Sequence, residues 1–413
     1  MRVLVAGVST RAAAESAARA GFTVTAIDSF ADLDQHASVQ ALSLPRRFTA
    51  HAAARAARNI ECDAVAYGSN FENHPGAVGT LAVGRALWGN APAVLRRVRD
   101  PFLLAQTIGR RGFPVPAVHS GEPGTLNPEP ETRDWLVKPL ASGGGHRVRA
   151  WRPAKGLPRG CYLQEFVEGT PGSVVFVAAG GRAVPLGITR QLVGERAFGA
   201  AGYRYCGNIL AAAEGEVAGP AGDAALVDRA CALANVVAEE FGLVGVNGID
   251  FVARDGVPYA IEVNPRWSAS LELVERAYGL SAFGVHAAAC AGGALPTFDL
   301  VEARRGVSSV GKAVVFARRD VVVGDTRAWL AHPASPALPA LPALPALPAL
   351  PALPADEVAQ IRDVPHPGEK IAAGRPVCTV FAAGLDAASC HAALVARAER
   401  VYADLAAWER RVA

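Results

Sequence analysis

One stretch, residues 246–268, limits strongly how this chain can fold. Two apolar, alternating runs at 248–252 and 257–263 flank an Arg-Asp-Gly turn, which indicates a β-hairpin. The hairpin would place Asp250 and Glu262 on paired strands with their side chains close together. Two adjacent carboxylates raise each other's pKa unless a cation lies between them. The stretch therefore predicts a structural element with a charged, ligand-binding face.

The polar residues after the second run extend this face. Asn264 would point its amide oxygen the same way as Glu262, and oxygen ligands of this kind suit Mg²⁺, with Mn²⁺ as an alternative. Arg266 follows at the next same-face position and carries a planar guanidinium suited to phosphate or acyl-phosphate oxygens. The alternative is that Asp250 and Glu262 are exposed residues of a solvated hairpin.

A lysine before a glycine-rich turn is the second signal. Only four of the 41 basic residues are lysines, and one of them, Lys138, ends a short apolar run just before Ser142-Gly143-Gly144-Gly145. Backbone N–H groups of such a turn, with an ammonium beside them, can cradle a phosphate. The alternative is a plain hairpin turn.

Residues 1–92 alternate strand and helix patterns, which predicts a small doubly wound, Rossmann-like unit. Such sheets bind ligands at the carboxyl ends of their strands, so we expect substrate contacts from Arg11 after the first strand and from Ser69 and Glu72 in the loop after the last. A polar loop with a helix cap explains the second segment equally well. A GxGxxG fingerprint is missing, which disfavours NAD.

Taken together, these motifs resemble the ATP-grasp superfamily. The resemblance is carried by Glu262-Val-Asn264-Pro-Arg266 with Asp250 twelve residues earlier, by Lys138 with its glycine loop, and by the Gln-Glu-Phe-Val run at 164–167. The overall layout is most similar to predicted ATP-dependent carboligases related to biotin carboxylase.

The resemblance implies roles for individual residues. Asp250, Glu262 and Asn264 would bind Mg²⁺, Lys138 and Arg266 would be catalytic, and Arg190 would either meet an anion or solvate a mobile loop. The linker lysine that often touches the α-phosphate in this superfamily is absent, and Arg97 or Arg99 would replace it. ATP would be held by Lys138, Ser142, Gly143, Gly144, Gly145, Gln164, Glu165, Phe166, Val167 and Glu168, the last as a ribose contact.

The expected fold is mixed α/β and α+β. A Rossmann-like pre-ATP-grasp domain would span residues 1–92, the ATP-grasp nucleotide-binding domain 93–295, and a small biotin-carboxylase-like module 296–413. Six consecutive Pro-Ala-Leu units interrupt the module, and the surrounding segment 333–355 reads as a semi-rigid polyproline II spacer.

The implied function is an ATP-dependent ligase that joins a small carboxylic acid to an amine, or to a thiol, through an acyl phosphate, releasing ADP and phosphate. Cofactor biosynthesis is a compatible setting. Two alternatives remain: a bicarbonate-activating carboxylase, and a non-catalytic ATP-binding protein.

The composition of the chain limits which partners the protein is expected to bind and where in the cell it is expected to lie. A net charge of +3 without a basic block disfavours nucleic acid, and no apolar run reaches membrane-spanning length. Seven scattered cysteines without a CxxC pair indicate reduced thiols in a cytoplasmic protein. A homodimer is compatible with this interpretation, although the sequence does not define the oligomeric state.

Overall fold

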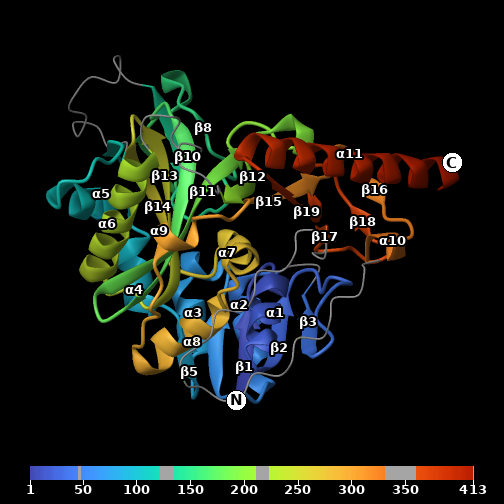
Figure 1. Ribbon diagram of the computed structural model, residues 1–413, viewed down its shortest axis with the longest axis horizontal. Coiled ribbons are helices and arrows are strands. Elements are labelled where there is room, and N and C mark those ends of the chain that lie inside the picture. The colour runs from blue at the N-terminus through green and yellow to red at the C-terminus, as the bar shows by residue number, and fades with distance from the viewer. Residues whose placement is uncertain (45–47, 121–133, 211–222, 331–359, 413) are drawn as a thin grey trace.

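The computed structural model describes residues 1–44, 48–120, 134–210, 223–330 and 360–412. The N-terminal part lies at the bottom of Figure 1, the large central sheet above it, and the C-terminal strands and helix at the upper right.

The N-terminal part is a five-stranded parallel sheet in the order β3-β2-β1-β4-β5. Apolar side chains alternate along β1, so Val3 and Val5 face one layer of helices while Leu4 and Ala6 face the other. The Rossmann-like arrangement expected in the N-terminal part is therefore present. Its elements are β1 (Arg2–Ala6), α1 (Arg11–Arg19), β2 (Thr23–Asp28), β3 (Val39–Ser43), α2 (Ala50–Ala56), η1 (Ala57–Asn59), β4 (Ala64–Tyr67), η2 (Phe71–Asn73), α3 (Pro75–Leu81) and β5 (Ala86–Trp88).

Two helices, α4 (Pro92–Val98) and α5 (Pro101–Arg110), lead into a four-stranded sheet. Its order is β6-β9-β7-β8, and all its pairs are antiparallel. The strands are β6 (Val118–His119), β7 (Trp135–Pro139), β8 (Arg149–Ala150) and β9 (Cys161–Glu165), with the short helix η4 (Pro153–Lys155) between the last two.

The central sheet has eight antiparallel strands in the order β14-β13-β10-β11-β12-β15-β19-β17. Helix α6 packs on one face, while α7 and α8 pack on the other. The elements are β10 (Thr170–Ala179), β11 (Arg182–Val193), η5 (Arg196–Phe198), β12 (Tyr205–Leu210), α6 (Asp223–Phe241), β13 (Gly245–Arg254), β14 (Val257–Asn264), α7 (Ser270–Tyr278), α8 (Ala282–Gly292), α9 (Leu300–Ala303), β15 (Ser309–Phe316), β17 (Ile361–Arg362) and β19 (Pro376–Gly384).

The hairpin predicted at 246–268 is confirmed as β13 and β14. Asp255 and Gly256 both adopt positive φ, at 53° and 70°, as a tight two-residue hairpin turn requires. The register pairs Asp250 with Glu262, and a bulge follows directly after Asp250. The two carboxylates are thus neighbours on adjacent strands.

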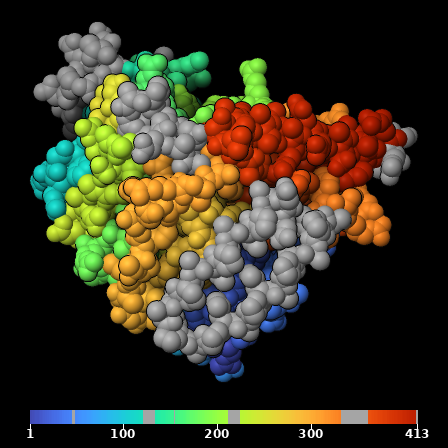
Figure 2. Space-filling model, viewed as in Figure 1, coloured from blue at the N-terminus to red at the C-terminus, as the bar shows by residue number. Residues whose placement is uncertain are grey.

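The C-terminal segment continues the central sheet, because β15 pairs with β12 and then with β19. Helix α11 (Ala387–Val412) covers these strands and forms a ridge along one edge of the molecule (Figure 2). The remaining elements are β16 (Val321–Val322), α10 (Arg327–Leu330) and β18 (Lys370–Ile371). The Pro-Ala-Leu segment 333–355 lies outside the described residues. Among the helices described, none is both long and apolar enough to cross a membrane.

Candidate functional site

A pocket of about 230 Å³, called the central pocket below, lies between the four-stranded sheet and the central sheet. The segment from Asn264 to Ser270 contributes to the lining. Its lining residues are Leu136, Lys138, Ser142, Gly143, Gly144, Gly145, Val148, Gln164, Ser173, Val175, Gln191, Tyr203, Tyr205, Asn208, Gly248, Asp250, Ile261, Glu262, Asn264, Arg266, Ser268, Ala269 and Ser270. Most of the residues singled out in the sequence therefore meet in one place.

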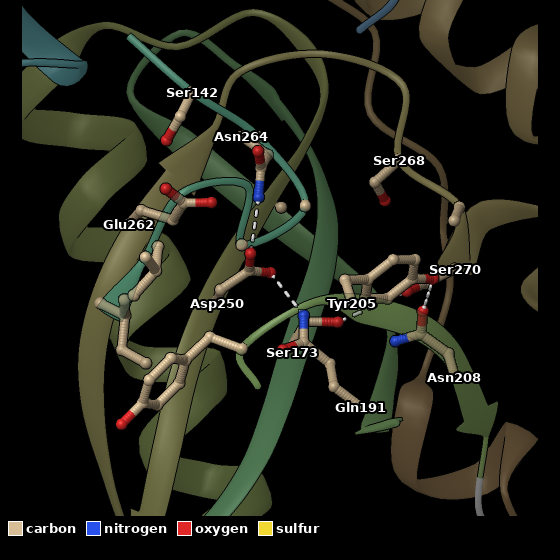
Figure 3. Close-up of a pocket in the computed structure, with 18 of the residues that line it drawn as sticks. Ser142, Ser173, Gln191, Tyr205, Asn208, Asp250, Glu262, Asn264, Ser268 and Ser270 are labelled. Carbon is tan, nitrogen blue, oxygen red and sulfur yellow. Dashed lines mark hydrogen bonds between the residues drawn. The ribbon is translucent and has the colours of Figure 1, made fainter. Parts of the chain in front are cut away.

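Asp250 and Glu262 face each other in this pocket (Figure 3). Burial, reinforced by the negative charge of Glu262, raises the pKa of Asp250 to about 7. Burial alone would also raise the pKa of Glu262, but the positive charges of Arg99 and Lys138 outweigh it and lower that pKa. At neutral pH the pair thus holds a carboxylate that is difficult to ionise.

This donor set fits a hard divalent cation, because a bound metal ion would stabilise the ionised form of Asp250, which burial and the charge of Glu262 disfavour. No group of three or more His, Cys, Asp or Glu side chains suited to a metal occurs in the described ranges. A cation at this site would accordingly be bound by two carboxylates. Oxygen atoms of a ligand or of water would complete its coordination shell, as is common for Mg²⁺.

Asn264 lies differently from the sequence expectation. Its amide nitrogen donates to Asp250 Oδ2 at 2.9 Å, while its oxygen accepts from Arg266 at 3.0 Å. The amide oxygen is therefore directed at the guanidinium and not at the carboxylates. Ligation of a metal through this oxygen would require the amide to turn over.

Lys138 extends from β7 into the pocket and is only 8% exposed. Burial lowers its pKa. Its Nζ donates to Gln164 Oε1 at 3.0 Å, and Gln164 Nε2 donates to the carbonyl of Ile261 at 3.3 Å. Gln164, predicted to help hold ATP, thus contacts the lysine in the structure.

The glycine loop packs against the segment before β12. Gly145 has φ +70°, and a Cβ there would lie 1.7 Å from the carbonyl oxygen of Tyr203. The N–H of Tyr205 donates to the carbonyl of Gly144 at 3.1 Å. Only glycine can occupy position 145 in this arrangement, which holds the loop over the pocket.

The residues that follow Gln164 do not line the central pocket. The N–H of Glu165 donates to the Ala117 carbonyl at 2.8 Å and that of Phe166 to the Asp134 carbonyl at 2.8 Å. Neither N–H is therefore available to a base in this conformation. Val167 and Glu168 also lie outside the lining set, so the ATP contacts expected from 165–168, including the ribose contact of Glu168, stay predictions.

Neutral polar side chains form the floor of the pocket, and sequence reasoning missed them. Ser173 stands opposite both Asp250 and Thr189 in the sheet, and its Oγ lies 2.9 Å from Thr189 Oγ1. Asn208 Nδ2 donates to Thr189 at 2.7 Å, and Ser270 lies 3.4 Å from Ser173. Gln191 Nε2 donates to Asp250 Oδ1 at 2.9 Å, and the hydroxyl of Tyr205 donates a hydrogen bond to Asn208 Oδ1.

Comparison with known proteins agrees with this geometry. Residues 98–270 match the family model described as "ATP-grasp domain". The chain carries an ATP-grasp domain. The matched range contains every charged group of the pocket from Lys138 to Arg266, and the resemblance and fold class expected from the sequence are confirmed. No curated protein sequence gives a match.

The similarity to solved structures with this fold covers nearly the whole chain. An L-amino acid ligase from Bacillus licheniformis is 15% identical with a TM-score of 0.64, covering 95% of each chain. The biotin carboxylase domain of Hydrogenobacter thermophilus 2-oxoglutarate carboxylase, a complex with MgADP, ADP and bicarbonate, is 15% identical with a TM-score of 0.64, over 93% of this chain and 86% of that one. An N5-carboxyaminoimidazole ribonucleotide synthetase from Thermus thermophilus is 16% identical with a TM-score of 0.64, over 96% and 98%.

One wall of the pocket joins the ATP-grasp domain to the N-terminal sheet. Arg266 Nε donates to Glu72 Oε1 at 2.7 Å, and its NH1 donates to the Trp267 carbonyl at 2.9 Å. Arg99, from the linker, lies 3.7 Å from Glu262 and donates to the Ser142 carbonyl at 3.1 Å. Arg97 instead donates to the Glu240 carbonyl, so of the two linker arginines only Arg99 reaches the site.

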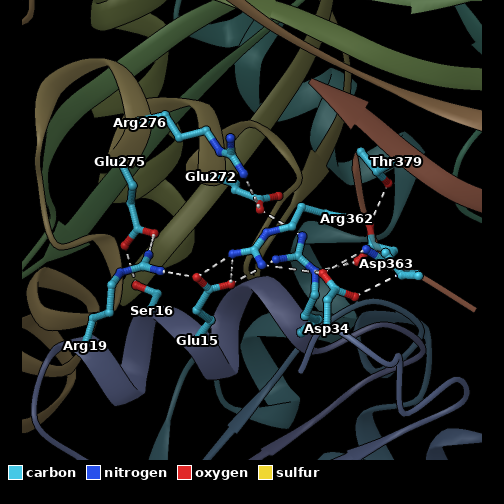
Figure 4. Close-up of polar contacts among 12 residues, drawn as sticks. Glu15, Ser16, Arg19, Asp34, Glu272, Glu275, Arg276, Arg362, Asp363 and Thr379 are labelled. Atoms are coloured by element: carbon cyan, nitrogen blue, oxygen red, sulfur yellow. Dashed lines mark hydrogen bonds and ion pairs between the residues drawn. The ribbon is translucent and has the colours of Figure 1, made fainter. Parts of the chain in front are cut away.

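The other residues predicted to contact substrate lie apart from the central pocket. Arg11 is buried in an ion-pair network between the three parts of the chain. Figure 4 shows other members of this network, among them Glu272 and Asp363. Its side chain is 1% exposed and meets Glu272 at 2.8 Å and Asp363 at 2.7 Å. Arg190 faces away from the pocket, since side chains alternate along β11 and Gln191 faces it. Ser69 is half-buried near the edge of the sheet and does not line the pocket.

Proposed function

We propose that the protein is an ATP-dependent ligase that joins a small carboxylic acid to an amine, or to a thiol, through an acyl phosphate, with ADP and phosphate as products. The observation that carries the proposal is the arrangement of the central pocket. The Asp250–Glu262 pair shares this pocket with a buried lysine, a glycine loop and the guanidinium of Arg266.

The residues of the pocket have distinct tasks in this reaction. Lys138 and the N–H groups of the glycine loop would hold the phosphates of ATP, and Arg99 offers a further cation beside the loop. Asp250 and Glu262 would hold Mg²⁺, or Mn²⁺, which when bound offsets negative charge on the phosphate oxygens. Asn264 would join them only after its amide turns over.

In the first step a carboxylate oxygen of the acid attacks the γ-phosphorus. The new O–P bond forms as the bond from phosphorus to the β,γ-bridging oxygen breaks, and ADP leaves. In the second step the amine nitrogen attacks the acyl carbon, the carbon–oxygen bond to phosphate breaks, phosphate leaves with the electron pair, and the nitrogen loses a proton to phosphate or water. Arg266 would stabilise the acyl phosphate and the oxyanion formed from it.

The lining of the pocket favours an amine as the nucleophile. Its only ionisable side chains among the described residues are Lys138, Asp250, Glu262, Arg266 and two tyrosines. Burial raises the pKa of Tyr205 above its ordinary value, so this phenol is not a base near neutrality. With the two carboxylates assigned to a metal, no spare base is present among these lining residues, and an unprotonated amine needs little help once it is oriented.

The test is ADP release by the purified protein with Mg-ATP against a panel of carboxylic acids, each with and without an amine, and with bicarbonate in a separate reaction. Stimulation that needs both an acid and an amine supports the proposal. Stimulation by bicarbonate alone would replace it with a carboxylase, and ATP binding without stimulation by any compound would replace it with a non-catalytic ATP-binding role.

A further inference from the structure

Both carboxylate oxygens of Asp250 accept hydrogen bonds from side-chain amides. Gln191 Nε2 donates to Oδ1 at 2.9 Å, and Asn264 Nδ2 donates to Oδ2 at 2.9 Å. Figure 3 shows the two bonds meeting at this one carboxylate. An amide that turns over presents its oxygen in place of its nitrogen, and oxygen is the atom that hard divalent cations bind. Each of the two amides is therefore a potential ligand of a cation at the carboxylate pair.

The two amides differ in what holds them. The side-chain oxygen of Asn264 accepts from the guanidinium of Arg266 at 3.0 Å. Turning this amide breaks two hydrogen bonds and brings its nitrogen towards a guanidinium, which cannot accept a hydrogen bond. Gln191 Oε1 accepts a hydrogen bond from no described residue, so turning Gln191 breaks only its bond to Asp250. Of the two amides, Gln191 thus turns at the lower cost.

Gln191 reaches Asp250 across an intervening strand. Gln191 lies on β11 and Asp250 on β13, with β10 between them. At this level β10 carries the small side chain of Ser173, which stands opposite Asp250 and leaves room for Gln191 to extend over the strand. Gln191 and Asp250 both line the central pocket and both are half-buried. The amide is therefore open to the same ligands as the carboxylate.

The surroundings of Gln191 suit either orientation of its amide. Asn208 stands opposite Gln191 in the pairing of β11 with β12, and both residues line the central pocket. Asn208 Oδ1 accepts from the hydroxyl of Tyr205 and keeps a second lone pair. The turned Nε2 of Gln191 would therefore face a part of the pocket that contains an acceptor.

We propose that Gln191 is a further ligand of the divalent cation bound by Asp250 and Glu262, with its amide turned so that Oε1 faces the cation. Gln191 lies outside the motifs that carry the family resemblance, which indicate Asn264 as the amide ligand. The assignment rests on the proposed function, because that function supplies the reason for a cation at the carboxylate pair. The competing role is an orienting one, in which Gln191 only donates to Asp250.

The test uses Mn²⁺ as the probe. Electron paramagnetic resonance of free Mn²⁺ gives the affinity, and the relaxation of water nuclei gives the number of water molecules coordinated to the bound ion. Gln191→Met keeps the size of the side chain and removes both its oxygen and its nitrogen. We expect this variant to bind Mn²⁺ about tenfold more weakly and to have about one more coordinated water, which replaces the lost oxygen. An orienting role predicts an unchanged number of coordinated waters.

Two further variants make the test specific. Gln191→Glu separates ligation from donation, because an ionised carboxylate can bind a cation but cannot donate to Asp250. We expect it to have the wild-type number of coordinated waters and to bind Mn²⁺ at least as tightly, and it decides the question on its own if Gln191→Met does not fold. Gln106→Met, the matched control, alters an exposed residue of α5 outside the central pocket and should change neither quantity.

Two results would overturn this inference alone: Gln191→Met binds Mn²⁺ with the wild-type number of coordinated waters, or Gln191→Glu has an additional coordinated water. Failure of the proposed function has a different signature. The wild type itself would then bind no Mn²⁺, with or without a non-hydrolysable ATP analogue, and that result would remove both the metal site and the role of Gln191 in it.

Discussion

Ser173 stands directly opposite Asp250 in the central sheet, so a row of polar side chains runs across adjacent strands from Glu262 through Asp250 and Ser173 to Thr189. The charged end of the row meets Lys138 and Arg266, whereas the neutral end is buried among hydroxyl and amide groups. One strip of sheet thus supplies a charged and a neutral recognition surface within the same pocket.

Glu262→Gln is expected to lower turnover by about two orders of magnitude or more, because it removes one of two carboxylates proposed to hold the metal that offsets phosphate charge. ATP should still bind weakly through Lys138 and the glycine loop. ADP release and nucleotide titration measure the two effects, with the exposed Glu239→Gln as the control. Near-normal turnover would refute the metal assignment.

Binding of Mg²⁺ should depend on pH because the pKa of Asp250 is raised to about 7 by burial and by Glu262. A carboxyl group must lose its proton to ligate a metal, so affinity should rise from about pH 6 to about pH 8 and level off above the pKa. Near neutral pH, binding should release a fraction of one proton, measurable by titration in buffers of different ionisation enthalpy. In Asp250→Asn the proton release should disappear, and persistence of the release would assign it to another group.

Gly145→Ala should weaken ATP binding by about tenfold, because the new Cβ would meet the Tyr203 carbonyl and position 145 has a positive φ. The loop would then have to move away from the pocket. Gly143→Ala is the matched control, since a Cβ at 143 meets no atom within 4 Å and its φ is not positive. Equal ATP affinities of the two variants would show that loop position does not control binding.

The hairpin was predictable because its signal is local: alternation, an Asp-Gly turn and two carboxylates twelve residues apart. The neutral floor was not, since Ser173, Thr189 and Asn208 are lone polar residues in separate strands, and only the order β10-β11-β12 joins them. Polar residues at alternating positions of buried strands were the signal that could have revealed them.

For Arg11, a local sequence signal led to a prediction that the structure does not support. It follows β1 at the strand edge where ligands usually bind, so a substrate role was the natural expectation. Its partners Glu272 and Asp363 lie 261 and 352 residues away in the chain, and nothing local indicates them. The structure places the guanidinium among these carboxylates, away from the central pocket.

Arg11→Met should destabilise the fold by about 3–5 kcal/mol, because it leaves several buried carboxylates without their shared cation. The loss should depend on pH. Burial alone would raise the pKa of Glu272, but Arg11, followed by Lys312 and Arg276, outweighs it and lowers that pKa well below its ordinary value. In the wild type, this stabilisation is fully present when the pH is above the pKa that Glu272 has in the unfolded protein. It is lost as the pH falls through the lower pKa that Glu272 has in the folded protein.

Without Arg11 the pKa of Glu272 rises, so protonation can relieve the uncompensated charge at mildly acidic pH. The difference in unfolding free energy between wild type and Arg11→Met should therefore be smaller at about pH 5 than at about pH 8. Urea unfolding at both pH values measures it, with Arg2→Met, which removes an exposed ion pair at the first strand, as the control. A difference that is equal at both pH values would show that lost packing, and not charge, explains the destabilisation.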